Sequence, residues 1–249
     1  RKHYKKAKKI YIMRLVLDAG NSSIKYGLFQ NHDIIDAGIL EKNTNINSVI
    51  DNEKLSKVTV ISSCKVTDEL QITGLPDVKH IQIDKNSKFP FNVNYKTPET
   101  LGIDRIVACS VNYRKGESLL VIDCGTCVTY DYISREGNYE GGAISPGIKL
   151  RFQAMNNFTD QLPLITRFNK NPKTIGDSTE NCMKSGVING LTHEMDGFVS
   201  KYFTLGSRLK VFLTGGDAIF FVEALKSSIF AEQNLVLKGL DFLIDLNEK

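Results

Sequence analysis

Two aspartates at the ends of apolar runs are the first candidates for chemistry in this chain. Asp18 and Asp123 each have a glycine two positions later, followed by small hydroxyl or amide residues and a return to strand-like sequence. This pattern is typical of a β-hairpin that carries a carboxylate at a strand end, and the glycine lets the backbone approach a ligand closely. One such hairpin in each half indicates a duplicated domain, with two carboxylates facing a cleft that suits a nucleotide phosphate tail and its metal.

The stretch Leu-Gly-Ile-Asp-Arg at residues 101–105 is a second candidate. Its glycine falls in the first turn of an expected helix, where it costs about 1 kcal/mol relative to alanine, and a ligand close to the backbone would explain it. Asp104 could then accept a proton from an attacking hydroxyl, while Arg105 holds an anionic group with two parallel hydrogen bonds. The alternative is an ordinary ion pair on a helix surface.

Thr-Gly-Gly-Asp at residues 214–217 is a third candidate. Two glycines after a strand let the chain lie flat against a planar group, although Asp217 could also simply cap a helix. The usual phosphate-binding signatures G-x-x-x-x-G-K-[ST] and G-x-G-x-x-G are absent from the sequence. The pair Cys124 and Cys127 matches C-x-x-C, but strand-like sequence follows it and no further zinc ligands have suitable spacing, which disfavours redox or zinc chemistry.

The elements expected around these motifs alternate strands with helices. In the first half we expect strands within residues 13–40, at 58–63 and at 80–84, the last one as an edge strand. A helix should start near Pro98 and end at Lys115-Gly116. In the second half the hairpin starts at Leu119, and after it we expect the following elements: a glycine-rich loop at 141–147, a helix at 148–157, a long helix from near 176 to 201, a strand at 210–213 and a closing amphipathic helix. The class is therefore α/β, with a boundary near residue 116.

Composition limits the remaining possibilities. The chain has 249 residues, of which 41% are hydrophobic, enough for two modest cores, and no apolar run approaches the roughly 18 residues that span a bilayer. The net charge is +4, but the first twelve residues contain six Lys or Arg and no acid, so the rest is mildly acidic. We therefore expect a basic leader at 1–12 outside the fold, and no membrane or specific nucleic-acid partner. Five cysteines in a chain of this size favour reduced thiols and a cytoplasmic location.

Five motifs, in this order, resemble those of the type III pantothenate kinase family. They are residues 18–22 (Asp-Ala-Gly-Asn-Ser), 101–105, 123–126 (Asp-Cys-Gly-Thr), 141–147 (Gly-Gly-Ala-Ile-Ser-Pro-Gly) and 214–217. The resemblance implies the acetate/sugar kinase–Hsp70–actin fold, in which two ribonuclease-H-like domains, here 13–116 and 117–249, flank a nucleotide cleft. It also implies a homodimer that makes 4′-phosphopantothenate from ATP and pantothenate, the first step of coenzyme A biosynthesis, with Mg²⁺ and a monovalent cation, K⁺ or NH₄⁺.

The resemblance assigns roles to particular positions. Asp104 would be the general base of a direct in-line transfer, Asp123 would bind the monovalent cation, and Asp18 would bind Mg²⁺ through the phosphates. The residues implied in ATP binding are Asp18, Ala19, Gly20, Asn21, Ser22, Ser23, Ile24, Lys25 and Thr126. Those implied in pantothenate binding are Tyr95, Gly102, Ile103, Asp104, Arg105 and, across the dimer interface, Thr179.

Three departures from the family pattern accompany this resemblance. Ser22 stands where threonine is usual, Cys127 stands where alanine is common, and the basic leader has no counterpart. Two alternative functions remain open: a kinase of the same fold for another small acid or sugar, and a non-enzymatic regulator like Bvg accessory factor. Nucleic-acid binding by the latter would depend steeply on salt.

Overall fold

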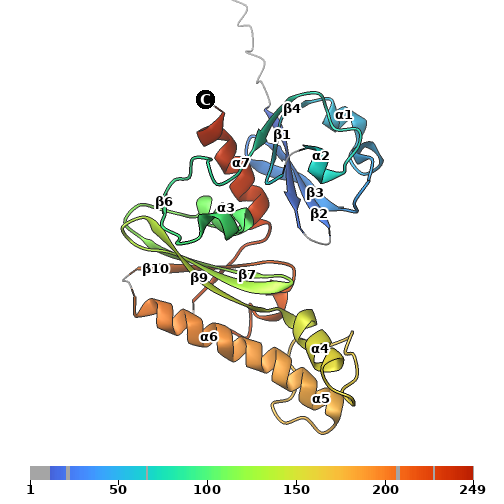
Figure 1. Cartoon of the computed structure of the whole chain (residues 1–249), viewed down its shortest axis with the longest axis vertical. Coiled ribbons are helices and arrows are strands. Elements are labelled where there is room, and N and C mark those ends of the chain that lie inside the picture. The colour runs from blue at the N-terminus through green and yellow to red at the C-terminus, as the bar shows by residue number, and fades with distance from the viewer. Residues whose placement is uncertain (1–11, 21–22, 66, 206–207, 227, 249) are drawn as a thin grey trace, which may run out of the picture. The chain divides into compact units, whose positions relative to one another are not determined.

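The chain forms two compact units. The computed structural model describes residues 12–20, 23–65, 67–205, 208–226 and 228–248 (Figure 1). The first unit comprises Arg1–Lys88 and Val236–Lys249, and the second comprises Phe89–Leu235. This division differs from the expected boundary near residue 116, because α3 (Ile103–Ser110) packs against strands β7 and β8 of the second unit. The last helix, α7 (Leu235–Asn247), belongs almost entirely to the first unit.

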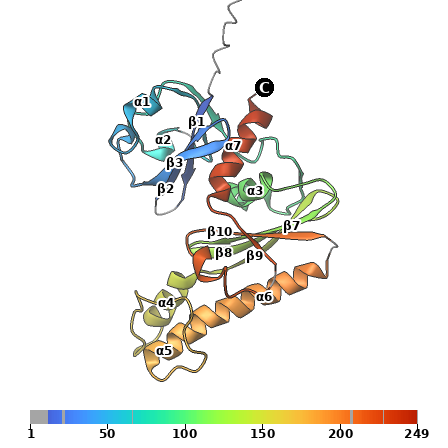
Figure 2. The same ribbon diagram turned by 180° about the vertical axis from the view of Figure 1, so that it is seen from behind.

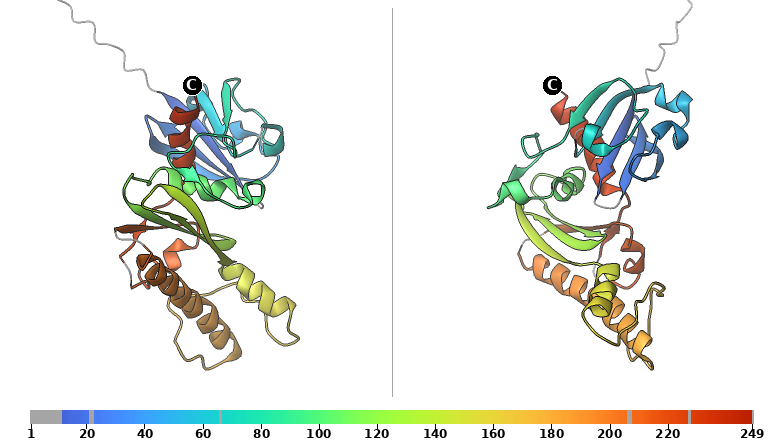
Figure 3. Two further views of the ribbon diagram at one scale, coloured as in Figure 1. Left: turned by 60° about the vertical axis from the view of Figure 1, so that its left-hand side comes forward. Right: turned by 45° about the vertical axis from the view of Figure 1, so that its right-hand side comes forward.

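The first unit is built on a five-stranded sheet in the order β3-β2-β1-β4-β5. β1 pairs antiparallel with β2 and parallel with β4, so the expected hairpin around Asp18 is present and β5 is an edge strand as predicted. The bounds are β1 (Met13–Ala19), β2 (Ile24–Gln30), β3 (Asp33–Leu40), β4 (Val58–Ser63) and β5 (Lys79–Gln82), with short helices η1 (Ile46–Ser48), α1 (Asn52–Leu55) and α2 (Thr67–Leu70). Helix α7 runs beside this sheet (Figure 3), and a side chain on Gly27 would collide with Leu237 and Phe29.

The second unit repeats this strand order. Its sheet runs β11-β10-β7-β8-β9-β6, with β7, β8 and β9 in the antiparallel meander and β10 and β11 parallel beyond β7. The bounds are β6 (Asn92–Val93), β7 (Ser118–Cys124), β8 (Cys127–Ile133), β9 (Asn138–Pro146), β10 (Leu209–Thr214) and β11 (Phe230–Ala231). Because β3-β2-β1-β4-β5 and β9-β8-β7-β10-β11 have the same order and directions, the predicted duplication of a ribonuclease-H-like domain is confirmed.

Helices cover both faces of the second sheet. Figures 1 and 2 show α6 along one face and α3 on the other. The remaining helical elements of this unit are η2 (Pro98–Thr100), α4 (Ile148–Asn157), α5 (Thr179–Lys184), a π-helical turn η3 (Ser185–Asn189), α6 (Gly190–Phe203) and η4 (Ala218–Phe220). Tyr130, Phe152 and Leu191 belong to the core between this sheet and the helices.

Three predicted elements differ from the structure. The helix expected to reach Gly116 ends at Ser110, because Arg114 donates to the carbonyl oxygens of Val111 and Tyr113 and turns the chain. The glycine-rich stretch 141–147 is mostly strand β9 rather than a loop, since the absence of a side chain at Gly142 lets it lie directly on the Tyr130 carbonyl. The closing amphipathic helix begins only at residue 235, after the short η4.

Candidate active site

Asp123 lies where three glycine-containing turns meet at one end of the second sheet. It is half-buried near the end of β7, in register with Thr214 of β10 and Thr129 of β8. A side chain on Gly215, whose φ is +97°, would come within 2.4 Å of the Asp123 Oδ1 atom. Glycine is therefore favoured at position 215 for two reasons: it tolerates the left-handed backbone conformation, and it leaves room for the Asp123 carboxylate.

The turn that contains Thr126 is closed by the start of α4. The amide of Gly147 donates to the Thr126 carbonyl over 2.9 Å, and a side chain on Gly147 would lie 2.2 Å from the Gly125 carbonyl oxygen. On the other side, the Asp217 amide donates to the Cys124 carbonyl over 3.0 Å. Burial raises the pKa of the Asp217 carboxyl, and the nearby Lys149 opposes that rise. The structure thus brings together the motifs at 123–126, 141–147 and 214–217.

Asp104 lies in the first turn of α3. It is exposed, and within the described part of the chain its carboxylate makes no hydrogen bond or ion pair. A side chain on Gly102, the residue before the helix, would lie 2.5 Å from the Asp104 Oδ1 atom. Gly102 therefore leaves room for the Asp104 carboxylate in the orientation that it adopts.

The Arg105 side chain points inward. The sequence alone suggested either an ion pair on the helix surface or a contact with the substrate. The Arg105 side chain is 8% exposed, and its Nε and Nη2 atoms lie 2.8 and 2.7 Å from Oδ1 of Asp131 on β8. Burial alone would lower the pKa of the Arg105 guanidinium, but the Asp131 charge more than offsets this and raises it. The arginine is permanently charged and held in one orientation.

Tyr95 and Tyr139 complete the surroundings of Arg105. Tyr95 hydrogen-bonds Arg105, and its ring centroid lies 6.2 Å from that of Tyr139. A side chain on Gly141, which has a φ of +90°, would collide with the Tyr95 ring. Gly102, Ile103, Asp104, Arg105 and Tyr95 therefore form one cluster around the start of α3, as predicted.

Sequence reasoning missed Asp131 and Tyr139. The signal was present, because Asp131 is the one charged residue of the strand-like run at residues 128–133. A carboxylate buried in a strand is costly unless it is paired, so it implies a cation on the neighbouring element.

Asp18 occupies the corresponding strand end in the first unit. It lies near the end of β1, directly opposite Lys25 in the β1–β2 hairpin. The Gly20 amide donates to the Ser23 carbonyl over 3.0 Å and tightens the turn. Ala19 and Ile24 form the last pair of the hairpin, whereas Asn21 and Ser22 lie outside the described residues.

Thr179 is separated from the other predicted pantothenate-binding residues. It is the exposed first residue of α5, and Figures 1 and 2 show α5 and α3 at opposite ends of the second unit. Within one copy of the unit, Thr179 therefore does not join the cluster around Asp104.

The redox alternative at Cys124 and Cys127 finds no support. All five cysteines are free thiols. Burial raises the pKa of the Cys124 thiol well above its ordinary value, which suppresses the thiolate that such chemistry requires.

Comparison with known proteins decides the family. The model of the family described as type III pantothenate kinase matches residues 14–201. Curated proteins of that name from Christiangramia forsetii and Flavobacterium johnsoniae are each 38% identical to this chain, and the alignments cover 95% and 92% of it and 99% and 96% of the relatives. The chain belongs to the type III pantothenate kinase family.

Type III pantothenate kinases phosphorylate pantothenate in coenzyme A biosynthesis, so the chain is a kinase and a divalent metal is implied with its ATP. A solved inorganic polyphosphate/ATP-glucomannokinase from an Arthrobacter species is also similar, with a TM-score of 0.43 and 11% identity over 94% of this chain and 99% of that one. Among the described residues, no three His, Cys, Asp or Glu side chains cluster as metal ligands, and no helix is long and apolar enough to cross a membrane.

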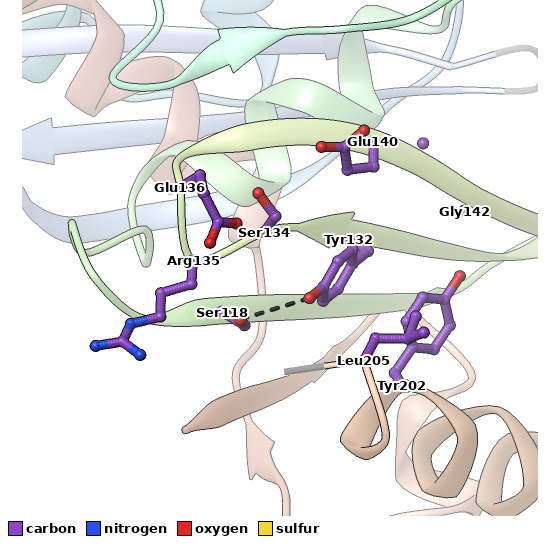
Figure 4. Close-up of a pocket in the computed structure, with 10 residues that line it drawn as sticks. Ser118, Tyr132, Ser134, Arg135, Glu136, Glu140, Gly142, Tyr202 and Leu205 are labelled. Carbon is purple, nitrogen blue, oxygen red and sulfur yellow. Dashed lines mark hydrogen bonds between the residues drawn. The ribbon is translucent and has the colours of Figure 1, made fainter. Parts of the chain in front are cut away.

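A cavity of about 680 Å³ on the second unit borders the 141–147 motif, because Gly141 and Gly142 line it. Figure 4 shows the Tyr132 hydroxyl directed toward Ser118, 3.5 Å away, and the Arg135 side chain pointing away from them. The lining residues are Ser118, Tyr132, Ser134, Arg135, Glu136, Glu140, Gly141, Gly142, Tyr202 and Leu205. None of them is a predicted site residue.

Proposed function

We propose that this chain transfers the γ-phosphoryl group of ATP directly to the hydroxyl of pantothenate, with Asp104 as the general base. The observation that carries this assignment is an exposed carboxylate without a protein partner in the described residues, next to an arginine held in place by Asp131. A free carboxylate can accept the proton of the attacking hydroxyl. Phosphoryl transfer depends mostly on positioning and electrostatic stabilisation, which a fixed cluster supplies.

Arg105 would bind the pantothenate carboxylate. A guanidinium has five N–H donors, and Asp131 faces only the Nε and Nη2 atoms. Donors on the outer side of the guanidinium therefore remain for a second acceptor beside Asp104. Tyr95, which is half-buried and hydrogen-bonded to Arg105, would line the same position.

The two hairpins would hold the triphosphate and its cations. Asp18 would hold Mg²⁺ through the phosphates, Lys25 and the backbone amides of residues 21–23 would bind the phosphate oxygens, and Thr126 would contact the nucleotide. Mg²⁺ usually binds through one or two carboxylates and the substrate phosphates, which fits a site with few protein ligands. Asp123 would bind the monovalent cation, K⁺ or NH₄⁺, because its carboxylate supplies hard oxygen ligands. A bound Mg²⁺ would offset negative charge on the transferring group.

A homodimer would complete the site. Thr179 lies away from Asp104 within one copy of the second unit, so we assign it to the site of a partner copy. Large apolar side chains exposed on this unit favour a protein partner; the most exposed are Phe158 at 86% and Ile175 at 84%. We place the enzyme in the cytoplasm, since five free cysteines are typical of a reducing compartment.

The decisive test is transfer of phosphate from ATP to pantothenate by the Asp104→Asn variant, assayed with and without K⁺. Asparagine keeps the shape of the side chain but cannot accept the proton, so kcat should fall by about 10²–10⁴ while ATP binding is retained. Glu99→Gln, which neutralises another exposed acid just before α3, is the matched control and should keep kcat. Full activity in the Asp104→Asn variant would show that Asp104 is not the general base. The alternative, a kinase of the same fold for another small acid or sugar, is tested by assaying a panel of such compounds as phosphate acceptors.

A further inference from the structure

Asp131 is the most deeply buried acid in the site cluster, and its carboxylate accepts hydrogen bonds from Arg105, Tyr139 and Thr129. The residue is 1% exposed. Its Oδ1 atom accepts from Arg105 Nε over 2.8 Å and from the Tyr139 hydroxyl over 2.7 Å, and its Oδ2 atom accepts from Thr129 Oγ1 over 2.9 Å. A carboxylate removed from water in this way is stable only when such partners satisfy it.

The donors to Asp131 come from three elements, and this fixes the orientation of its carboxylate. Thr129 lies on the same face of β8 two residues earlier, and Tyr139 lies on the neighbouring strand β9. Arg105 comes from α3, on the other side of the contact. Since both Arg105 nitrogens bind the same Oδ1 atom, the plane of the guanidinium is set by groups that the substrate does not touch.

We propose that Asp131 is a positioning residue, which holds the Arg105 guanidinium so that its remaining N–H groups face the carboxylate of pantothenate. This inference rests on the proposed role of Arg105. An arginine with a free side chain would lose rotational freedom each time it bound substrate, whereas one already paired binds without that loss. Asp131 therefore affects the binding of pantothenate without contacting it, and it has no part in binding ATP.

A double-mutant cycle between Asp131→Asn and Arg105→Met tests the proposal. Each single variant should raise the KM for pantothenate by roughly tenfold or more, because each removes the oriented guanidinium. The KM for ATP and kcat should stay within about threefold of wild type, since neither side chain is placed at the phosphates. The double variant should show no larger KM than Arg105→Met alone, because Asp131 acts only through Arg105.

Milder variants keep the test valid if Asp131→Asn fails to fold. Thr129→Val removes one hydrogen bond to Asp131 while the ion pair remains, and it should raise the KM for pantothenate a few-fold in the wild-type background and not at all with Arg105→Met. The matched control is Tyr132→Phe, because the hydroxyl of this neighbouring β8 residue contacts Ser118 instead of Asp131. Its kinetics should equal those of wild type.

The outcomes separate this inference from the proposed function. An unchanged KM in Arg105→Met would reject the proposed role of Arg105, and the Asp131 inference with it. A raised KM in Arg105→Met together with an unchanged KM in both Asp131→Asn and Thr129→Val would overturn only the positioning role. Effects that multiply in the double variant would also overturn it, because they would show that Asp131 acts independently of Arg105.

Discussion

Gly215 lacks a side chain at a point where one would collide with the candidate cation ligand Asp123. Its φ of +97° is one that residues with a side chain rarely adopt, and an added Cβ atom would come within 2.5 Å of the Cys124 backbone nitrogen as well. The next residue, Gly216, is different, because an added Cβ atom there would meet nothing within 4 Å. Two adjacent glycines thus have separable roles.

Gly215→Ala should therefore impair the enzyme far more than Gly216→Ala. The strained backbone should cost about 1–3 kcal/mol of stability, and displacement of Asp123 should lower kcat/KM by up to about 10²-fold. Gly216→Ala serves as the control and should stay close to wild type in both respects. Thermal unfolding and steady-state kinetics measure the two effects, and equal losses in the two variants would contradict the steric role assigned to Gly215.

Helix α7 is held to the first sheet by a buried charge cluster. Arg14 on β1 is 7% exposed at its side chain and lies 3.3 Å from Oδ1 of Asp241 and 2.5 Å from Oδ1 of Asp245. The Nδ1 atom of His32, in the β2–β3 turn, lies 2.7 Å from Oδ2 of Asp241. Burial alone would lower the pKa of Arg14, but the two carboxylates more than offset this and raise it.

The two acids of this cluster should differ in their contribution to stability. Asp241 is 4% exposed and Asp245 is 50% exposed. Asp241→Asn leaves Arg14 buried with its charge uncompensated on the inner side, so the free energy of unfolding should fall by about 3–5 kcal/mol. Asp245→Asn, the matched control, should cost at most about 1 kcal/mol. Urea unfolding followed by circular dichroism gives both values, and faster hydrogen exchange along α7 should accompany only the first variant.

Local patterns predicted the hairpins and most strands, because apolar runs, turn residues and strand alternation act within a few residues. Helix α4 also has the predicted bounds. What could not be predicted depended on contacts between distant segments. The end of α3 is set by Arg114 and the packing of Tyr113 against Phe91, whose ring centroids lie 5.5 Å apart. The partner of Arg105 lies on a strand 26 positions away, so the spacing of 101–105 alone could not reveal it.

At the scale of the whole molecule, the proposed site needs residues from two copies of the chain. If Thr179 serves the partner, then Asp104→Asn and Thr179→Val disable different halves of each shared site. Separately, both variants should be nearly inactive. Mixed under conditions that exchange subunits, they should recover about a quarter of wild-type activity, since half the dimers are mixed and each contains one intact site.

This complementation has a clear control. Two different Asp104 variants mixed in the same way should recover nothing, because every site still lacks the base. Mass spectrometry of the intact dimers should show that exchange occurred. Exchange without recovered activity would assign Thr179 to its own protomer, or to no role at all.

The return of α7 to the first unit has a consequence for how the protein is made. The sheet of that unit is translated first, yet the helix that carries Asp241 is translated only after the whole second unit. Until then Arg14 has no partner from α7 and Gly27 lacks its contact with Leu237. The second unit is continuous in the chain and can therefore complete its structure before α7 has been made. The first unit must wait for α7, and a nascent chain stalled before residue 236 would leave it open to proteases and chaperones.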